Sequence, residues 1–332
     1  MSISIFLVAC KNNTKPVEKK IYMMGTIIDL KVYGKNAEEA TEKAIKRVEE
    51  IENKMSVNIE TSEISKLNTK AGVSGEKLSA DTYSVIEKAV QYSKLTEGAF
   101  DPTIEPIVKL WGIGTDAERV PSVDEITEKL KLVDYKDIIL DGGNSTAQLK
   151  RTNQAIDLGA IAKGYTADEI KGILLENKIS SAIINLGGNI YAMGNKEDGA
   201  KWNIGIQNPL DERGKYLGTV TVSDKSVVTS GNYERFFMVG TKRYHHIFDP
   251  KNGYPSENGI ISTTIISDKS IDGDVLSTST YIMGINKAQK LVESIEGVEA
   301  IFITDDKKIY VTSGIKDSFK LTGKGFTYEE GR

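Results

Sequence analysis

An aspartate and a threonine spaced four residues apart are the first candidates for chemistry. Asp274 and Thr278 lie in the segment 272–280, DGDVLSTST. If a helix begins near Val275, the two side chains share one helical face. A carboxylate and a hydroxyl at this spacing suit Mg²⁺, which uses few protein ligands and leaves positions open for phosphate oxygens. The same pattern also fits an aspartate that caps a helix, followed by an exposed threonine.

A second segment combines small residues with a lysine. Residues 157–165 read DLGAIAKGY, and the small side chains would let a ligand approach the backbone closely at a helix N-terminus. Lys163 would add a positive charge for a phosphate group. The alternative is an ordinary strand-to-helix turn with a lysine after it. The segment is not a P-loop, because the pattern GxxxxGK[ST] is absent from it.

Three further segments are rich in turn-forming residues. The segment 244–255 holds both histidines of the chain, His245 and His246, beside a turn. A histidine near a phosphate can carry a proton or donate a hydrogen bond, although a pair of solvated strand residues also fits. Residues 98–104 could place backbone against a planar ring, and residues 185–190 end a strand in a diglycine turn. Structural loops are the alternative for both of these segments.

Composition limits the classes of site that the chain can hold. Its 332 residues include 43 Lys and Arg against 47 Asp and Glu, so the net charge is −4. With no basic block, this balance argues against nucleic-acid binding. A single cysteine excludes an internal disulfide, a CxxC redox pair and a cysteine-based zinc site, and two histidines exclude a histidine-rich cluster. A metal would therefore be a hard ion on oxygen ligands.

The elements that must position these residues follow from periodicity and capping signals. Capping boxes are expected at Asn36 with Glu39 and at Ser122 with Glu125. Strands and helices mix without strict βαβ alternation, which predicts an α+β fold. Helices are expected over residues 36–55, 79–95, 122–132, 165–176, 276–283 and 286–295. Strands are expected over residues 22–33, 138–140, 147–150, 181–186, 201–206, 217–222, 236–239, 260–267, 300–303 and 309–312.

The lone cysteine, Cys10, ends the apolar run 5–9 and precedes a polar stretch. This arrangement resembles a bacterial lipobox, in which the cysteine becomes the lipidated first residue. The alternative is an ordinary buried or disordered cysteine. We expect residues 1–20 to be signal and tether, and residues 21–332 to form the folded domain. That domain would be lipid-anchored to the cell membrane on the extracytoplasmic side, since no other apolar run approaches the roughly 18 residues of a membrane span.

Taken together, the segments resemble the ApbE family, the FAD:protein FMN transferases. The matching motifs follow the family's order and cover nearly the whole of the expected domain. They are MGT at 24–26, SEISKLN at 62–68, GAFDPTI at 98–104, DLGAIAKGYTAD at 157–168, NLGGNIY at 185–191, VTSGNYER at 228–235, YHHIFDPKNGYP at 244–255 and DGDVLSTSTYIMG at 272–284.

The resemblance implies one compact catalytic unit of mixed, largely antiparallel sheets with packed helices. It implies an enzyme that splits the FAD pyrophosphate, attaches FMN through a phosphoester to a threonine of a partner flavoprotein, and releases AMP. Mg²⁺ would be bound by the side chains of Asp274 and Thr278 and the carbonyl of Ala160. Residues implied to line the FAD site are Met24, Ala99, Phe100, Asp101, Asp157, Lys163 and Ile247. For the proton of the acceptor threonine, His246 is the first candidate base, and Asp249 and an unidentified carboxylate are the alternatives.

One position departs from the family pattern. Members often carry an aromatic residue where Asn58 stands, so the stacking partner of the flavin ring is left open. Two other functions stay open beside the transferase. A Mg²⁺-dependent FAD pyrophosphatase would use water in place of threonine and give free FMN and AMP. A non-catalytic, lipid-anchored flavin-binding protein is the other, and the pair Asp274 and Thr278 argues against it.

Overall fold

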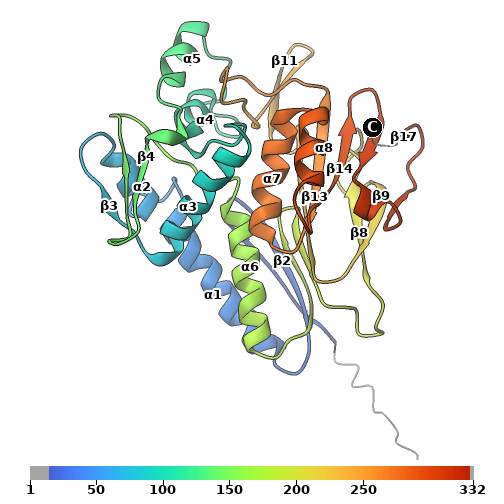
Figure 1. The fold of residues 1–332 in the computed structure, drawn as a ribbon. Helices are drawn as coiled ribbons and strands as arrows, with labels where there is room; N and C mark the ends of the chain where they lie inside the picture. Colours follow the sequence, from blue (N-terminus) through green and yellow to red (C-terminus); the bar gives the residue numbers. More distant parts are fainter. Residues whose placement is uncertain (1–14, 330–332) are drawn as a thin grey trace, which may run out of the picture.

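A nine-stranded sheet forms the centre of the computed structural model, which describes residues 15–329 (Figure 1). Its strands are β1 (Val17–Met23), β2 (Thr26–Tyr33), β6 (Ser181–Leu186), β7 (Asn189–Met193), β10 (Lys225–Gly231), β13 (Ile260–Ser267), β14 (Glu299–Thr304), β15 (Lys308–Val311) and β17 (Thr327–Glu329), in this spatial order. Neighbours pair antiparallel, except that β15 and β17 are parallel. The predicted α+β class with largely antiparallel sheets is confirmed.

Three small sheets accompany the large one. Their strands are β16 (Phe319–Leu321), β9 (Tyr216–Val222) and β8 (Trp202–Gln207) in the first, β3 (Glu76–Lys77), β5 (Thr146–Leu149) and β4 (Ile138–Asp141) in the second, and β11 (Phe236–Val239) with β12 (Lys242–His245) in the third. The β8–β9–β16 sheet packs through its apolar side chains against one face of the large sheet. The β11–β12 hairpin connects the 228–235 motif to the 244–255 motif, which carries both histidines.

Helices cover the other face of the large sheet (Figure 1). The α-helices are α1 (Ala37–Met55), α2 (Glu63–Thr69), α3 (Ala80–Leu95), α4 (Glu105–Trp111), α5 (Val123–Leu130), α6 (Ala162–Glu176), α7 (Ser270–Met283) and α8 (Ile285–Glu293). Helices α1 and α6 bury apolar residues against β2 and β6, while α7 and α8 pack over β13 and β14. Because both of its faces are covered, β13 is buried along its whole length.

The expected strand over residues 22–33 is a hairpin instead. Its turn is Met24–Gly25, with φ of +53° and +67°, the backbone of the tight turns that join antiparallel strands. The Met24 N–H donates to Glu52 Oε1 on α1 at 2.6 Å. A contact from a distant helix thus helps to hold methionine in a conformation that is uncommon for its residue type. Strand β1 begins at Val17, ahead of the boundary expected at residue 21.

Helix boundaries near the candidate site also differ from expectation. Helix α7 begins at Ser270 rather than near Val275, so Asp274 lies in its second turn and is not an N-cap. Helix α6 begins at Ala162, which places Lys163 in its first turn. The capping box at Ser122 is confirmed, whereas the Asn36 side chain donates to the Asn177 carbonyl oxygen instead of capping α1.

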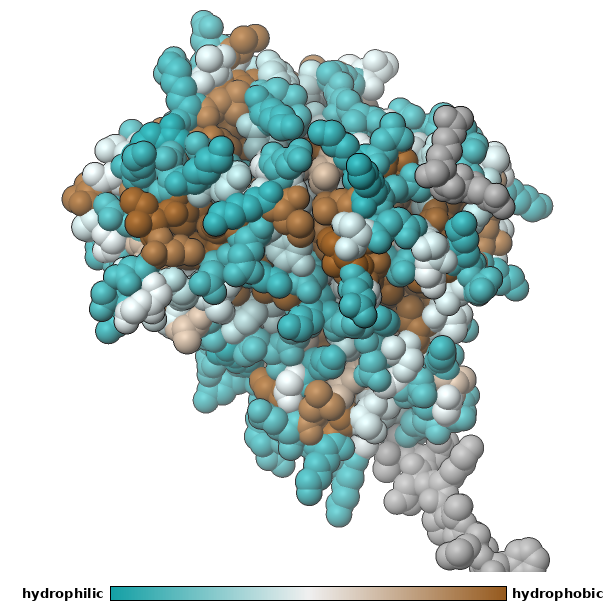
Figure 2. Space-filling model, viewed as in Figure 1, coloured by the Kyte–Doolittle hydropathy of each residue, from teal (hydrophilic) through white to brown (hydrophobic). Residues whose placement is uncertain are grey.

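Within residues 15–329, no helix is both long enough and apolar enough to cross a membrane. Figure 2 shows hydrophilic side chains over most of the visible face, with hydrophobic side chains in several separate patches. Cys10 and the apolar run before it lie outside the described residues.

Candidate functional site

Helices α6 and α7 meet at a backbone-to-carboxylate hydrogen bond. The Gly164 N–H in the first turn of α6 donates to Asp274 Oδ2 on α7 at 2.8 Å, across 110 residues of sequence. A Cβ atom at Gly164 would lie 2.4 Å from the Ser270 carbonyl oxygen and 2.7 Å from the Asp274 Cβ. The absence of a side chain at Gly164 therefore permits the close approach that brings Asp274 to the start of α6.

Replacing Gly164 with alanine should force these two helices apart. The new methyl group would meet backbone atoms of α7, so we expect a loss of about 1–3 kcal/mol in the free energy of unfolding. Gly172→Ala is the matched control on the same helix, because a Cβ there would meet no described heavy atom within 4 Å. That control should gain up to about 1 kcal/mol from helix propensity. Urea unfolding of both variants measures the difference, and equal stabilities would contradict the close contact.

Lys163 places a cation beside this junction. Its Nζ donates to the Gly159 carbonyl oxygen at 2.7 Å and lies 3.7 Å from Asp274 Oδ1. The N-terminal N–H groups of α6 add partial positive charge at the same end of the helix. Together they suit a ligand that carries phosphate charge.

Thr278 lies one turn after Asp274 on α7, and its hydroxyl is 3.3 Å from the Ser230 hydroxyl of β10. Ala160 lies in the turn that leads into α6. Among the described residues no three His, Cys, Asp or Glu side chains gather into a metal-binding cluster. The Asp274 carboxylate, the Thr278 hydroxyl and the Ala160 carbonyl would offer oxygen donors only. Few protein ligands, all of them oxygen, are what Mg²⁺ uses when it leaves positions for ligand oxygens, so the chemistry of these groups suits that ion.

Asp157 and Arg235 bring two further segments to the same region. The Asp157 N–H donates to the Pro102 carbonyl oxygen at 2.8 Å, which joins it to the 98–104 turn. Burial raises the pKa of Asp157, while the Gly159 N–H and the charges of Lys163 and Arg235 oppose that rise. Arg235 Nη2 also donates to the Gly25 carbonyl oxygen at 2.9 Å, and so links the site to the β1–β2 turn.

His246 and His245 have different environments. His246 Nδ1 lies 3.2 Å from the Arg235 carbonyl oxygen, a partner that can only accept, so Nδ1 carries the proton and Nε2 has a free lone pair. Burial, with the nearby charges of Arg235 and Lys163, lowers the pKa of His246 to about 4. His245 is buried and donates from Nε2 to the Ser256 carbonyl oxygen at 3.1 Å, which gives it a structural role.

Asp101 is used within the protein. Its Oδ1 accepts from the backbone N–H and the hydroxyl of Thr103, at 2.8 and 2.6 Å, and its Oδ2 accepts from the Tyr135 N–H at 2.9 Å. These bonds shape the turn that carries Ala99 and Phe100, both of which are buried. Asp101 thus positions the turn. Both oxygens of its carboxylate already accept hydrogen bonds from the protein, and a ligand would have to share them with Thr103 and Tyr135.

Three further residues considered for the flavin site, Ile247, Met24 and Asn58, differ in how deeply they are buried. Ile247 is buried in the core cluster that also contains Phe100. Met24 is partly buried, and its sulfur accepts from the Thr166 hydroxyl of α6 at 3.5 Å. Asn58 is exposed in the turn after α1, where its N–H donates to the Ser56 hydroxyl at 3.2 Å.

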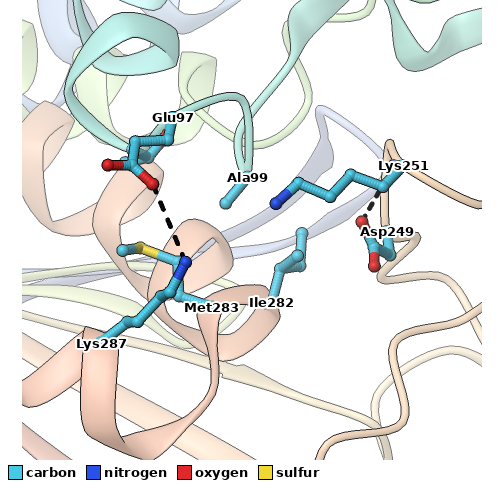
Figure 3. Close-up of a pocket in the computed structure, with 8 residues that line it drawn as sticks. Glu97, Ala99, Asp249, Lys251, Ile282, Met283 and Lys287 are labelled. Atoms are coloured by element: carbon cyan, nitrogen blue, oxygen red, sulfur yellow. Dashed lines mark hydrogen bonds and ion pairs between the residues drawn. The ribbon is translucent and has the colours of Figure 1, made fainter.

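A pocket lies next to Ala99, at the C-terminal end of α7 (Figure 3). Ile282 lines it one turn beyond Thr278 on α7. Figure 3 shows the amine of Lys251 directed toward Ala99. Its lining residues are Thr96, Glu97, Ala99, Asp249, Lys251, Ile282, Met283 and Lys287. Asp249 accepts from the Lys251 N–H at 2.9 Å within its own turn, which makes it a weaker base candidate than His246.

Sequence reasoning missed three ionisable residues of this region: Arg235, Glu105 and Asp168. Arg235 ends the VTSGNYER motif and could have been found there as a cation. Burial raises the pKa of Glu105 to about 8, and the negative charge of Asp157 contributes to this rise. The Glu105 carboxyl is therefore protonated at neutral pH and can donate a hydrogen bond. Asp168, at the end of the DLGAIAKGYTAD motif, accepts from two backbone N–H groups of α7. Their roles depend on neighbours that are distant in sequence, which no local pattern indicates.

Curated relatives match this chain over nearly its whole length. It is 35% identical over 324 residues to an FAD:protein FMN transferase of Treponema pallidum, with 92% of this chain and 90% of the relative covered. An FAD:protein FMN transferase of Klebsiella pneumoniae is 34% identical, with 92% and 94% covered.

Solved structures agree with these relatives. The ApbE protein of Thermotoga maritima superposes with a TM-score of 0.85 at 31% identity, covering 92% of this chain and 99% of that one. The flavin transferase ApbE of Vibrio cholerae gives 0.81 at 27% identity, with 92% and 99% covered. The sequence model of the ApbE family matches residues 24–302. Because the family model and these relatives match most of the chain, the chain belongs to the ApbE family.

Proposed function

We propose that this protein is a Mg²⁺-dependent FAD:protein FMN transferase. It cleaves the FAD pyrophosphate and attaches FMN through a phosphoester to a threonine of a partner flavoprotein, with release of AMP. The observation that carries the proposal is the α6–α7 junction, where the phosphate-binding features of α6 meet the buried carboxylate of Asp274. The names of the relatives support the same activity.

The residues divide between the metal and FAD. Asp274, Thr278 and the Ala160 carbonyl would hold Mg²⁺, which, when bound, neutralises charge on the pyrophosphate oxygens. Lys163 adds a second positive charge 3.7 Å from Asp274 Oδ1. The rest of the FAD site would be lined by Met24, Ala99, Phe100, Asp101, Asp157 and Ile247.

His246 is the proposed base. With Nδ1 donating to the Arg235 carbonyl oxygen, its Nε2 can accept the proton of the acceptor threonine hydroxyl. The threonine oxygen forms a bond to the FMN phosphorus as the bond from that phosphorus to the bridging oxygen breaks. AMP leaves with the bridging oxygen, and the threonine proton remains on His246 until solvent removes it. The lowered pKa of His246 keeps the ring neutral, and ready to accept a proton, at neutral pH.

We also propose that Cys10 is lipidated and anchors the protein to the cell membrane with its catalytic domain on the extracytoplasmic side. The support is the lipobox-like run of apolar residues before Cys10 and the polar stretch after it. Cys10→Ala should release the protein from the membrane fraction and abolish incorporation of labelled palmitate. Continued membrane association and labelling in that variant would contradict the anchor.

The decisive experiment incubates the protein with FAD, Mg²⁺ and a candidate acceptor, then separates the products by chromatography and mass spectrometry. AMP together with flavin covalently bound to the acceptor is expected. AMP with free FMN alone would favour the pyrophosphatase. Unchanged FAD with several acceptors would favour a flavin-binding protein, and an acceptor-free incubation provides the control for slow hydrolysis.

A further inference from the structure

We infer that Asp168 is a positioning residue for the metal-binding face of helix α7. Helix α7 starts directly after Lys269, whose backbone is extended. Asp168 Oδ1 accepts from the Ser270 N–H at 2.8 Å, and Oδ2 accepts from the Ile271 N–H at 2.9 Å. These are two of the N–H groups that the start of a helix leaves without an intrahelical partner. A side chain of α6 therefore caps α7. The inference rests on the proposed Mg²⁺ site.

The cap belongs to a reciprocal pair of contacts. Asp168 lies one turn after Gly164 on α6, and Asp274 lies one turn after Ser270 on α7. At one level the carboxylate of Asp168 accepts from backbone N–H groups of α7, and at the other the carboxylate of Asp274 accepts from the Gly164 N–H of α6. Two contacts one helical pitch apart fix both the rotation of α7 and its position along α6.

This pair determines which oxygen of Asp274 is available. Oδ2 is bonded to Gly164, whereas Oδ1 faces Lys163 at 3.7 Å. Loss of the Asp168 cap would let the start of α7 rotate away from α6, and Asp274 and Thr278 would move with it. Metal ligands tolerate displacements of only about 0.5 Å, so the effect on Mg²⁺ should be large.

The Ser270 side chain makes two further hydrogen bonds at the start of α7, and these hold the helix against the large sheet rather than against α6. The Ser270 hydroxyl donates to Asn189 Oδ1 at 2.7 Å and accepts from the Ser226 hydroxyl at 3.0 Å. Both partners belong to strands of the large sheet, so they hold α7 down on the sheet. Asp168 supplies the side-chain hydrogen bonds that hold the helix start against α6, where Gly164 also packs closely on Ser270.

The substitution Asp168→Asn should leave the protein folded. Burial raises the pKa of Asp168 to about 6, so the ionised carboxylate is disfavoured there and a neutral amide avoids that cost. The charged and titratable groups around it are Lys171 on its own helix, Asp272 on α7 and Tyr191 on β7. Asparagine has the same shape and keeps one acceptor oxygen, whereas alanine keeps none.

The test is titration of the full chain with MgCl₂ by calorimetry, in the absence of FAD. Asp168→Asn should weaken Mg²⁺ binding by about 10-fold to 100-fold, which is the usual effect of replacing a residue that holds metal ligands in place. Asp168→Ala should weaken it further. Glu169→Gln is the matched control, because Glu169 is the adjacent acid on α6 and its ion pair is with Arg47 of α1. That control should bind Mg²⁺ like the wild type.

Hydrogen exchange gives a second readout that does not depend on Mg²⁺. Exchange in a peptide that covers residues 268–276 should accelerate in Asp168→Asn and stay unchanged in Glu169→Gln. If Asp168→Asn binds Mg²⁺ as tightly as Glu169→Gln and shows the same exchange, the inference is wrong while the proposed metal site stands. If the wild-type chain itself does not bind Mg²⁺, the metal site of the proposed function is overturned and the inference with it.

Discussion

Asp274→Ala is expected to abolish Mg²⁺-dependent release of AMP, with a rate at least about 1000-fold below wild type. Asp274 is the only carboxylate in the proposed ligand set, and a bound metal contributes several kcal/mol of transition-state stabilisation. The substitution also leaves the buried Gly164 N–H without its acceptor, which should cost about 1–3 kcal/mol of folding free energy. Initial rates with FAD, measured by AMP chromatography across a range of MgCl₂ concentrations, test the expectation.

Two companion variants separate metal binding from folding. Asp274→Asn keeps an oxygen for Gly164 but loses the charge, so it should stay folded and still be inactive. Asp272→Asn removes the same charge from the same helix, where Asp272 pairs with Lys88 at 3.0 Å, and should retain activity. Full activity of Asp274→Asn would contradict the assignment of Asp274 to the metal.

His246→Ala should lower transfer to the acceptor by about 10²-fold to 10⁴-fold, the usual contribution of a general base. Binding of FAD should change much less, because the proposed role of His246 is toward the acceptor hydroxyl. Rates of covalent flavin incorporation, compared with the equilibrium affinity for FAD, separate these two effects.

The pH dependence gives an independent check on the same histidine. Protonation of Nε2 removes the lone pair that accepts the threonine proton, so activity should be lost as the pH falls through the pKa of His246, about 4. Through the neutral range this group should contribute no change in rate. His245→Gln is the matched control, since His245 bonds Ser256 inside the core and its replacement should affect stability more than the rate of the folded enzyme. A rate in His246→Ala equal to that of wild type would exclude the histidine as the base.

Local sequence patterns predicted the elements whose residues carry their own signals. Strands β6, β11 and β13 have the expected bounds, because alternating or continuous apolar residues between turn signals identify them. Helix α5 begins at its capping box, Ser122 with Glu125, for the same reason. The spacing of Asp274 and Thr278 likewise placed both on one helix, whichever residue began it.

Elements that are completed by distant partners were predicted less well. Helix α7 begins earlier than expected because its cap, Asp168, comes from α6, and Met24 turns the chain with Glu52 of α1 as its partner. The sequence implied that Asp101 lines the FAD site. It could not show that three donors of the protein bind the Asp101 carboxylate, since one of them, the Tyr135 N–H, lies 34 residues away. In each case the deciding hydrogen bond joins segments that only folding brings together.

By itself, the sequence determined the chemistry available to this protein: oxygen ligands for a hard cation, a lysine for phosphate, two histidines, and the order of motifs typical of the ApbE family. The tertiary structure decided which of these residues meet. Gly164 lacks the side chain that would separate α6 from α7, and so Asp274 reaches Lys163 across more than a hundred residues of chain. It also decided which histidine has a free nitrogen. His245 donates from Nε2 to the Ser256 carbonyl oxygen and accepts at Nδ1 from the Ile247 N–H, whereas His246 donates from Nδ1 to the Arg235 carbonyl oxygen and keeps the lone pair of Nε2.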